Sequence, residues 1–203
     1  TYLGACVELG PGDIDADVVA DSEITYFEGY LWDPPEAKNA IRLACDIAHK
    51  AGRRTAITLS DTFCVDRYRD EFVDLIRSNQ VDIVFANAGE ARALYQTSDT
   101  DTALDMLAQD CALAAVTNGA NDAMVITREQ RLAVPTFPPS DLKDTTGAGD
   151  WFAGGFLYGL TSGRSLETCA RIGHFVASAV IEEVGPRPFG DIGQRVEQAG
   201  LLA

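Results

Sequence analysis

The sequence has 203 residues, of which 46% are hydrophobic and 23% are charged, and this is the composition of a globular domain with a sizeable core. Its net charge of −15 disfavours nucleic acid and anionic membrane surfaces as partners. We find no apolar run near the roughly 18 residues of a membrane span and no signal-peptide pattern. The five cysteines are widely spaced without a C-x-x-C pair, which is typical of reduced cysteines in a cytoplasmic protein.

The first part of the chain alternates predicted strands and helices. Asp33 is predicted to cap one helix whose first position is Pro34, and Lys50 and Gly52 close it. This alternation favours a parallel sheet, in which ligands bind at the carboxyl ends of the strands. The predicted strands are residues 2–7, 24–31, 55–59 and 81–86, and helices are predicted at residues 15–21, 33–50 and 65–76.

The second part begins with Asn87-Ala-Gly-Glu90, which follows a predicted strand. Asn followed three residues later by Glu is a capping-box pattern, so it predicts a helix that runs through Tyr95. Gly119 suits a tight turn, and the prolines between residues 135 and 139 predict a stiff connector. The other elements expected here are a helix at 101–109, a strand at 112–117, a hairpin at 122–134, and helices at 165–184 and 191–199.

The stretch from Asp144 to Gly159 is the most informative part of the sequence. Small residues come first, and Phe152, Phe156 and Leu160 then recur at a spacing of four, which predicts a helix that opens near Gly147. The start of a helix carries unpaired backbone N–H groups and a partial positive charge, and glycines let an anion approach them. The stretch therefore predicts a phosphate site.

Asp150 stands in the first turn of that helix. One interpretation makes it only a helix-start residue, because the helix dipole stabilises a carboxylate there. The other makes it a base that accepts the proton of an attacking hydroxyl while the amides hold a phosphoryl group.

Asp144-Thr-Thr-Gly-Ala-Gly-Asp150 resembles the signature of the ribokinase-like (PfkB) family of carbohydrate and nucleoside kinases, and the Gly154-Gly155 pair fits as well. The resemblance extends from about residue 26 to residue 188. It implies an ATP-dependent kinase in which Asp150 is the catalytic base and Gly147 opens the helix. The amides of Ala148, Gly149 and Asp150 then form the anion hole.

Other motifs occur in the order of that family. Its second signature is Asn-x-x-Glu after a strand, where the resemblance implies that Glu90 acts on the magnesium ion through water. Asp122 departs from the family, which usually has Gly at that point of the nucleotide turn. His174 lies in a stretch that resembles the adenine-pocket helix of adenosine kinases, with a core or surface histidine as the alternative. The implied cofactor-binding residues are Asn87, Glu90, Thr117, Gly119, His174 and Ser178.

The resemblance implies a three-layer α/β/α fold with a mostly parallel, ribokinase-like sheet. We expect residues 1–203 to form a single nucleotide-binding and catalytic domain that is incomplete at its N-terminus. Family members are longer, and their first strands, small lid and most of their sugar-binding side chains are expected to be missing here.

The resulting hypothesis is transfer of the γ-phosphoryl group of ATP, with Mg²⁺, to a hydroxyl of an adenosine-like nucleoside or of a sugar. K⁺ dependence, found in some relatives, and a homodimer are left open. A non-catalytic nucleotide-binding remnant is the alternative if Thr1 is the true terminus. A dinucleotide-dependent oxidoreductase is disfavoured because Phe152 replaces the third glycine of its fingerprint, and no Walker motif exists.

Overall fold

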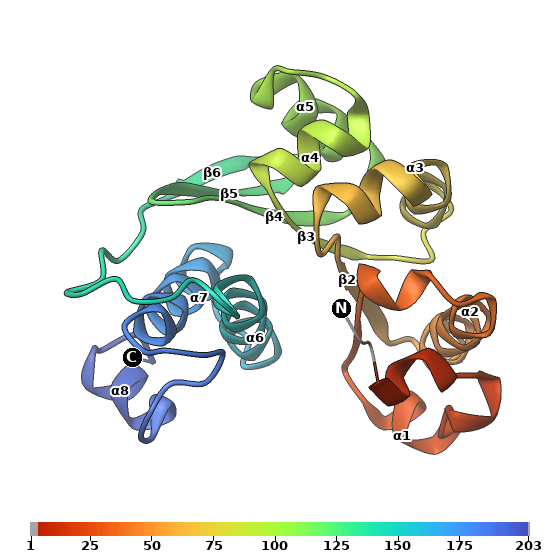
Figure 1. Cartoon of the computed structure of the whole chain (residues 1–203), viewed down its shortest axis with the longest axis horizontal. Coiled ribbons are helices and arrows are strands. Elements are labelled where there is room, and N and C mark those ends of the chain that lie inside the picture. The colour runs from red at the N-terminus through yellow and green to blue at the C-terminus, as the bar shows by residue number, and fades with distance from the viewer. Residues whose placement is uncertain (1–3, 203) are drawn as a thin grey trace. The chain divides into compact units, whose positions relative to one another are not determined.

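The computed structural model describes residues 4–202, which divide into two compact units. Residues 1–114 and 126–130 belong to the first unit, and residues 115–125 and 131–203 belong to the second. The described strands form a sheet in the order β1-β2-β3-β4-β5-β6, and helices alternate with them along the chain (Figure 1). The predicted α/β class is therefore confirmed.

The elements follow the predicted order closely. The first unit contains η1 (Gly4–Glu8), η2 (Pro11–Asp13), α1 (Ala16–Asp21), β1 (Ile24–Glu28), η3 (Gly29–Trp32), α2 (Pro35–Lys50), β2 (Arg54–Thr58), α3 (Thr62–Arg77), β3 (Ile83–Asn87), α4 (Ala88–Tyr95) and α5 (Thr100–Asp110). The rest of the chain forms β4 (Leu113–Asn118), β5 (Asn121–Thr127), β6 (Arg131–Val134), α6 (Ala148–Thr161), α7 (Leu166–Ile181) and α8 (Ile192–Gln198).

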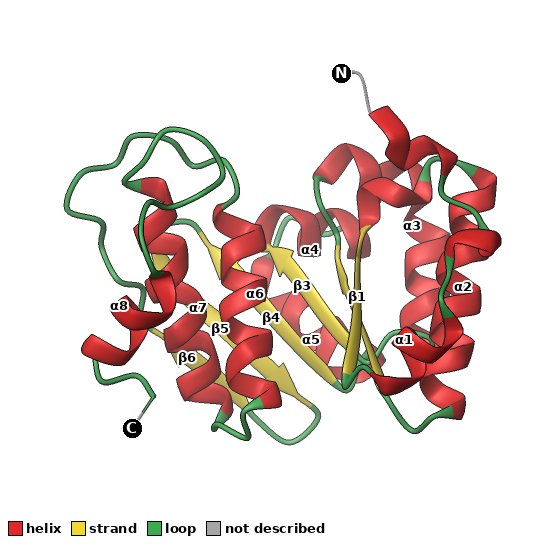
Figure 2. Ribbon diagram, turned by 90° about the horizontal axis from the view of Figure 1, so that it is seen from below, coloured by secondary structure: helices red, strands yellow, loops and turns green. Residues whose placement is uncertain are grey.

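The first three strands are parallel and in simple register. Glu28 of β1 is opposite Thr58 of β2, which is opposite Phe85 of β3. The carboxyl ends of these strands therefore share one edge of the sheet (Figure 2). In the first unit, the start of η3, the turn at Ser60 and the start of α4 all follow at this edge.

The N-terminal strand prediction is wrong. Residues 4–8 form the short helix η1, while Tyr2 and Leu3 of the predicted strand lie outside the described residues. Gly4 has a φ of +66°, a left-handed conformation that does not continue a strand.

Two predictions near Asp33 also fail. The strand at β1 ends at Glu28 because the chain turns into η3, where a Cβ on Gly29 would lie 2.9 Å from the carbonyl oxygen of Leu59. Asp33 does not cap α2, which starts at Pro35 with Pro34 at the N-cap. The carboxylate of Asp33 instead accepts hydrogen bonds from Arg67 and Tyr68.

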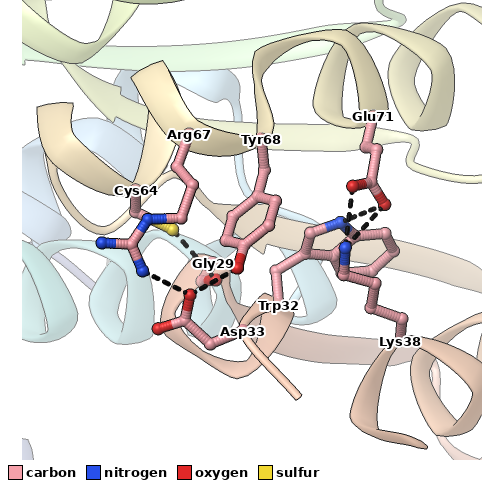
Figure 3. Close-up of polar contacts among 8 residues, drawn as sticks. All are labelled: Gly29, Trp32, Asp33, Lys38, Cys64, Arg67, Tyr68 and Glu71. Atoms are coloured by element: carbon pink, nitrogen blue, oxygen red, sulfur yellow. Dashed lines mark hydrogen bonds and ion pairs between the residues drawn. The ribbon is translucent and has the colours of Figure 1, made fainter. Parts of the chain in front are cut away.

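Polar contacts around a buried tryptophan hold η3 to α2 and α3 (Figure 3). The indole N–H of Trp32 donates to Glu71 at 2.9 Å, and the ammonium of Lys38 donates to the same carboxylate at 2.7 Å. The Lys38 ammonium also lies 4.3 Å from the centre of the Tyr68 ring. A partly buried cation with a carboxylate and an aromatic face is well satisfied, so this cluster fixes the segment that follows β1.

In the second unit, α6 and α7 pack side by side through glycines (Figures 1 and 2). A Cβ on Gly155 would lie 2.9 Å from the Cα of Gly173 and 2.7 Å from Val176. Ile172 and Val176 of α7 also form a core cluster with Val196 of α8.

Among the described residues, no helix is both long and apolar enough to cross a membrane.

Candidate functional site

The start of α6 provides the backbone geometry that the sequence predicts. Gly147 is the N-cap and has a φ of +81°, and a Cβ there would lie 3.1 Å from Pro186. Both the left-handed conformation and the contact require glycine. The N–H of Ala148 already donates to the carbonyl of Thr145, whereas the amides of Gly149 and Asp150 have no partner among the described residues. Two first-turn N–H groups are therefore available to an anion.

Two loops are joined at this helix start. The carboxylate of Asp144 accepts hydrogen bonds from Thr146 and from the N–H of Gly185, and these bonds hold its pKa below the usual value. The indole of Trp151 donates to the carbonyl of Pro186 at 2.8 Å. The turn before α6 is thus attached to the loop that follows α7.

A cavity of about 400 Å³ opens beside this turn, within the second unit. Its walls come from the end of β4, the connector after β6, the first turn of α6 and one face of α7. It is mostly apolar, which suits a planar base, and it has helix amides at one side. It brings together six of the predicted site residues, namely Thr117, Gly119, Ala148, Gly149, His174 and Ser178.

His174 is a buried residue of the cavity wall. It is 6% exposed, its ring packs edge-on against Phe152 with centroids 5.0 Å apart, and it bonds to the backbone of Val134. Burial lowers the pKa of His174, so the ring is neutral at pH 7. Its Nε2 atom is buried without a hydrogen-bond partner, an unsatisfied acceptor next to the cavity. The core and cavity interpretations of His174 are therefore compatible.

Asp150 lines a second and larger cavity, of about 770 Å³, between α6, α7 and α8. Residues of α6 that share this face include Gly154 and Tyr158. Asp150 is exposed at the helix start, and its partial desolvation raises the pKa of its carboxyl. A raised pKa makes a carboxylate a better proton acceptor.

Asn87 and Glu90 belong to the first unit and form a complete capping box. The Asn87 side chain accepts from the N–H of Glu90 at 2.9 Å, and Glu90 accepts from the N–H of Asn87 at 2.9 Å. Burial raises the pKa of Glu90 to about 7, opposed by the Asn87 backbone bond and assisted by the charge of Asp61. The capping prediction is confirmed, and Glu90 is a buried carboxylate at the carboxyl edge of β3.

The connector after β6 was expected only to be stiff, and sequence reasoning missed its part in the cavity. Pro138, Pro139 and Leu142 line the smaller cavity, opposite Ala177 and Ile181 of α7. A proline-rich, partly apolar segment directly before the predicted phosphate-binding turn is the signal that could have indicated this wall.

The described residues hold no group of three or more His, Cys, Asp or Glu side chains that could bind a metal ion. Mg²⁺ keeps several waters and is commonly held by substrate phosphates with one or two carboxylates. The single buried carboxylate of Glu90 fits that mode of binding.

Comparison with known proteins agrees with this geometry. The family model described as pfkB family carbohydrate kinase matches residues 5–190. A probable sugar kinase of Rhizobium etli and an adenosine kinase of Sinorhizobium meliloti have solved structures that are each 57% identical, with TM-scores of 0.97 and 0.96, over 98% of this chain and 61% of theirs. Adenosine kinase of Saccharomyces cerevisiae is 29% identical over 92% of this chain and 58% of its own length.

The chain thus spans about three fifths of these relatives, with 61% of the solved structures and 58% of the yeast enzyme covered. Its fold is the ribokinase-like α/β fold. Taken together, the match across residues 5–190 and the helix start at Gly147 establish that the chain belongs to the pfkB family of carbohydrate kinases.

Proposed function

We propose that the protein containing this chain transfers the γ-phosphoryl group of ATP to a hydroxyl of a nucleoside or a sugar. The start of α6 is the observation that supports this most strongly. It combines two unpartnered amides, at Gly149 and Asp150, with a carboxylate whose pKa is raised. Such a group can both hold a phosphate and accept a proton.

In the proposed reaction the acceptor oxygen attacks the γ-phosphorus in line with the leaving oxygen of ADP. The bond from oxygen to phosphorus forms as the bond to the β-phosphate oxygen breaks, and Asp150 takes the hydroxyl proton. The amides of Gly149 and Asp150 stabilise the charge on the transferring group. Because this transition state is loose, orientation by the helix start contributes more than the basicity of the carboxylate.

The donor base is assigned to the smaller cavity. Its apolar walls accept a planar ring. Ala148 and Gly149 also line this cavity, so the start of α6 forms part of its wall. The residues proposed to contact the nucleotide are Thr117, Gly119, His174 and Ser178.

We propose that Mg²⁺ binds together with the phosphates of ATP, where it would neutralise part of their negative charge. Glu90 is the residue proposed to hold the magnesium ion, through a water molecule. Asn87 positions Glu90 through the capping box.

An adenosine-like nucleoside is the favoured acceptor, and a sugar is the second candidate. A probable sugar kinase and an adenosine kinase are each 57% identical to this chain, and the matched yeast relative is also an adenosine kinase, which supports this order. Among the described residues no disulfide joins the five cysteines, which fits the proposed cytoplasmic location.

The test is an assay of ATP-dependent phosphorylation with the whole protein, adenosine, and a panel of sugars that includes ribose. We expect a phosphorylated nucleoside or sugar and stoichiometric ADP. Nucleotide binding without transfer to any acceptor would favour the non-catalytic remnant. Absence of nucleotide binding would contradict both the kinase proposal and the alternative of a non-catalytic remnant.

A further inference from the structure

The segment from Pro138 to Leu142, which forms one wall of the smaller cavity, is attached to the end of α7 through the side chain of Glu182. The N–H of Ser140 donates to Oε1 of Glu182 at 2.6 Å, and the Ser140 hydroxyl donates to the same oxygen at 2.8 Å. Both bonds are made to a charged acceptor, the stronger class of hydrogen bond. Forty-two positions of sequence separate the two residues, so this is a tertiary attachment.

The position of Ser140 in this segment makes the attachment important. Pro138 and Pro139 carry no backbone N–H, so Ser140 supplies the first amide after them that can anchor the wall. Beyond Leu142, the amides of Lys143 and Asp144 donate to the carbonyl of Ile181. The wall is thus held against the end of α7 at its middle, by Ser140, and directly after its last residue, and Leu142 lines the cavity between these two attachments.

Glu182 is an unusual residue for its place. It is the C-cap of α7, and the C-terminus of a helix carries partial negative charge, so a carboxylate there is disfavoured. The two bonds from Ser140 offset this cost and hold the pKa of Glu182 below its usual value. Arg195 of α8 lies 3.9 Å from the other carboxylate oxygen. The side chain therefore has a defined orientation, with Oε1 committed to Ser140.

We propose that Glu182 is a positioning residue for the donor base: by holding Ser140, it fixes the proline-rich wall against which the base of ATP packs. This inference rests on the proposed function, because it assigns the smaller cavity to the donor nucleotide. The phosphate site at the start of α6 uses backbone amides of a different element, and the hydrogen bonds of Glu182 go to Ser140 and not to those amides.

Two probes separate these parts of the site. ATP occupies both the base cavity and the phosphate site, whereas inorganic tripolyphosphate occupies only the phosphate site. The affinities of both are measured by titration calorimetry at one Mg²⁺ concentration, with the whole protein and Glu182→Ala. We expect the Kd for ATP to rise about tenfold, as for loss of a charge-assisted bond, and the Kd for tripolyphosphate to change less than about twofold.

Glu182→Gln keeps an oxygen acceptor for Ser140 and should restore most of the ATP affinity. Glu183→Ala is the matched control, because it removes the same charge one residue later, from a side chain that Ser140 does not contact. In steady-state assays, Glu182→Ala should raise the KM for ATP and leave kcat at saturating ATP nearly unchanged.

An unchanged ratio of ATP to tripolyphosphate affinity in Glu182→Ala would overturn the inference while leaving the proposed function standing. An equal loss for both probes would also overturn it, since the residue would then support the whole unit. If the unaltered protein binds neither probe, the proposed function itself is wrong and this inference falls with it.

Discussion

Asp144 and Gly185 are joined by a hydrogen bond of 2.9 Å from the Gly185 N–H to Oδ2 of Asp144. The other oxygen of the carboxylate accepts the N–H and the hydroxyl of Thr146 at 2.9 and 2.7 Å. One side chain thus shapes the turn before α6 and ties it to the loop after α7. Gly147, the N-cap of α6, lies in that turn and packs against Pro186 of that loop.

Asp144→Asn should weaken phosphate binding. Asparagine has only one acceptor oxygen, so it cannot keep both the Gly185 bond and the Thr146 bonds, and the connection between the turn and the loop is weakened. We expect the affinity for tripolyphosphate to fall by about three- to tenfold, with a small fall in the midpoint of thermal unfolding. Asp141→Asn is the control, because that carboxylate is exposed and has only a 4.0 Å contact with Lys143. Equal behaviour of the two variants would show that the connection has no role in the site.

The contribution of Asp144 to stability should depend on pH. Its folded pKa is lowered by Thr146 and Gly185, so its stabilising effect is fully present above the unfolded pKa of about 3.9 and is lost as pH falls through the folded value. The difference in unfolding free energy between the natural protein and Asp144→Asn should be constant from pH 7 to pH 5. It should shrink in denaturant titrations below pH 4. A difference that grows on acidification would contradict this assignment.

Gly149→Ala should separate folding from phosphate binding. No atom lies within 4 Å of a Cβ at Gly149, so alanine fits the helix and should keep or raise the unfolding midpoint. The methyl group would stand beside the amide that is proposed to hold the phosphate, so affinity for tripolyphosphate should fall at least about tenfold. Gly154→Ala is equally free of obstruction and lies five residues further along α6, so the affinity of this variant should not change. Full affinity in Gly149→Ala would place the anion elsewhere.

Gly155→Ala should destabilise the second unit. The added methyl group would meet the backbone of Gly173 on α7, where neither helix can yield without losing packing. Overpacking of this kind costs about 1–3 kcal/mol, which denaturant unfolding can measure. Gly154→Ala, on the adjacent position, is again the control and should be neutral or slightly stabilising. A neutral Gly155→Ala would mean that the two helices can separate at little cost.

The features predicted well from the sequence are those with local causes. The α6 start depends on glycines and on an apolar spacing within about one helix length, and the Asn87–Glu90 box depends on residues three apart. Capping and periodicity act within a few residues, so a single sequence contains the whole signal.

The features that were missed depend on distant partners. Asp33 has the residue type of a helix cap, yet Arg67 and Tyr68 of α3 bind its carboxylate. The connector around Pro138 becomes a cavity wall because Ser140 reaches Glu182 after α7. Sequence pattern alone does not say which of several polar partners a side chain will meet.

The central claim is that Asp150 accepts the proton of the attacking hydroxyl, and it is tested most directly by the turnover of Asp150→Asn in the whole protein. Asparagine keeps the size of the side chain and removes the base. We predict that kcat for phosphorylation of the preferred acceptor falls about 10²–10⁴-fold, while the Kd for ATP stays within about threefold. Unchanged kcat in Asp150→Asn would contradict the account.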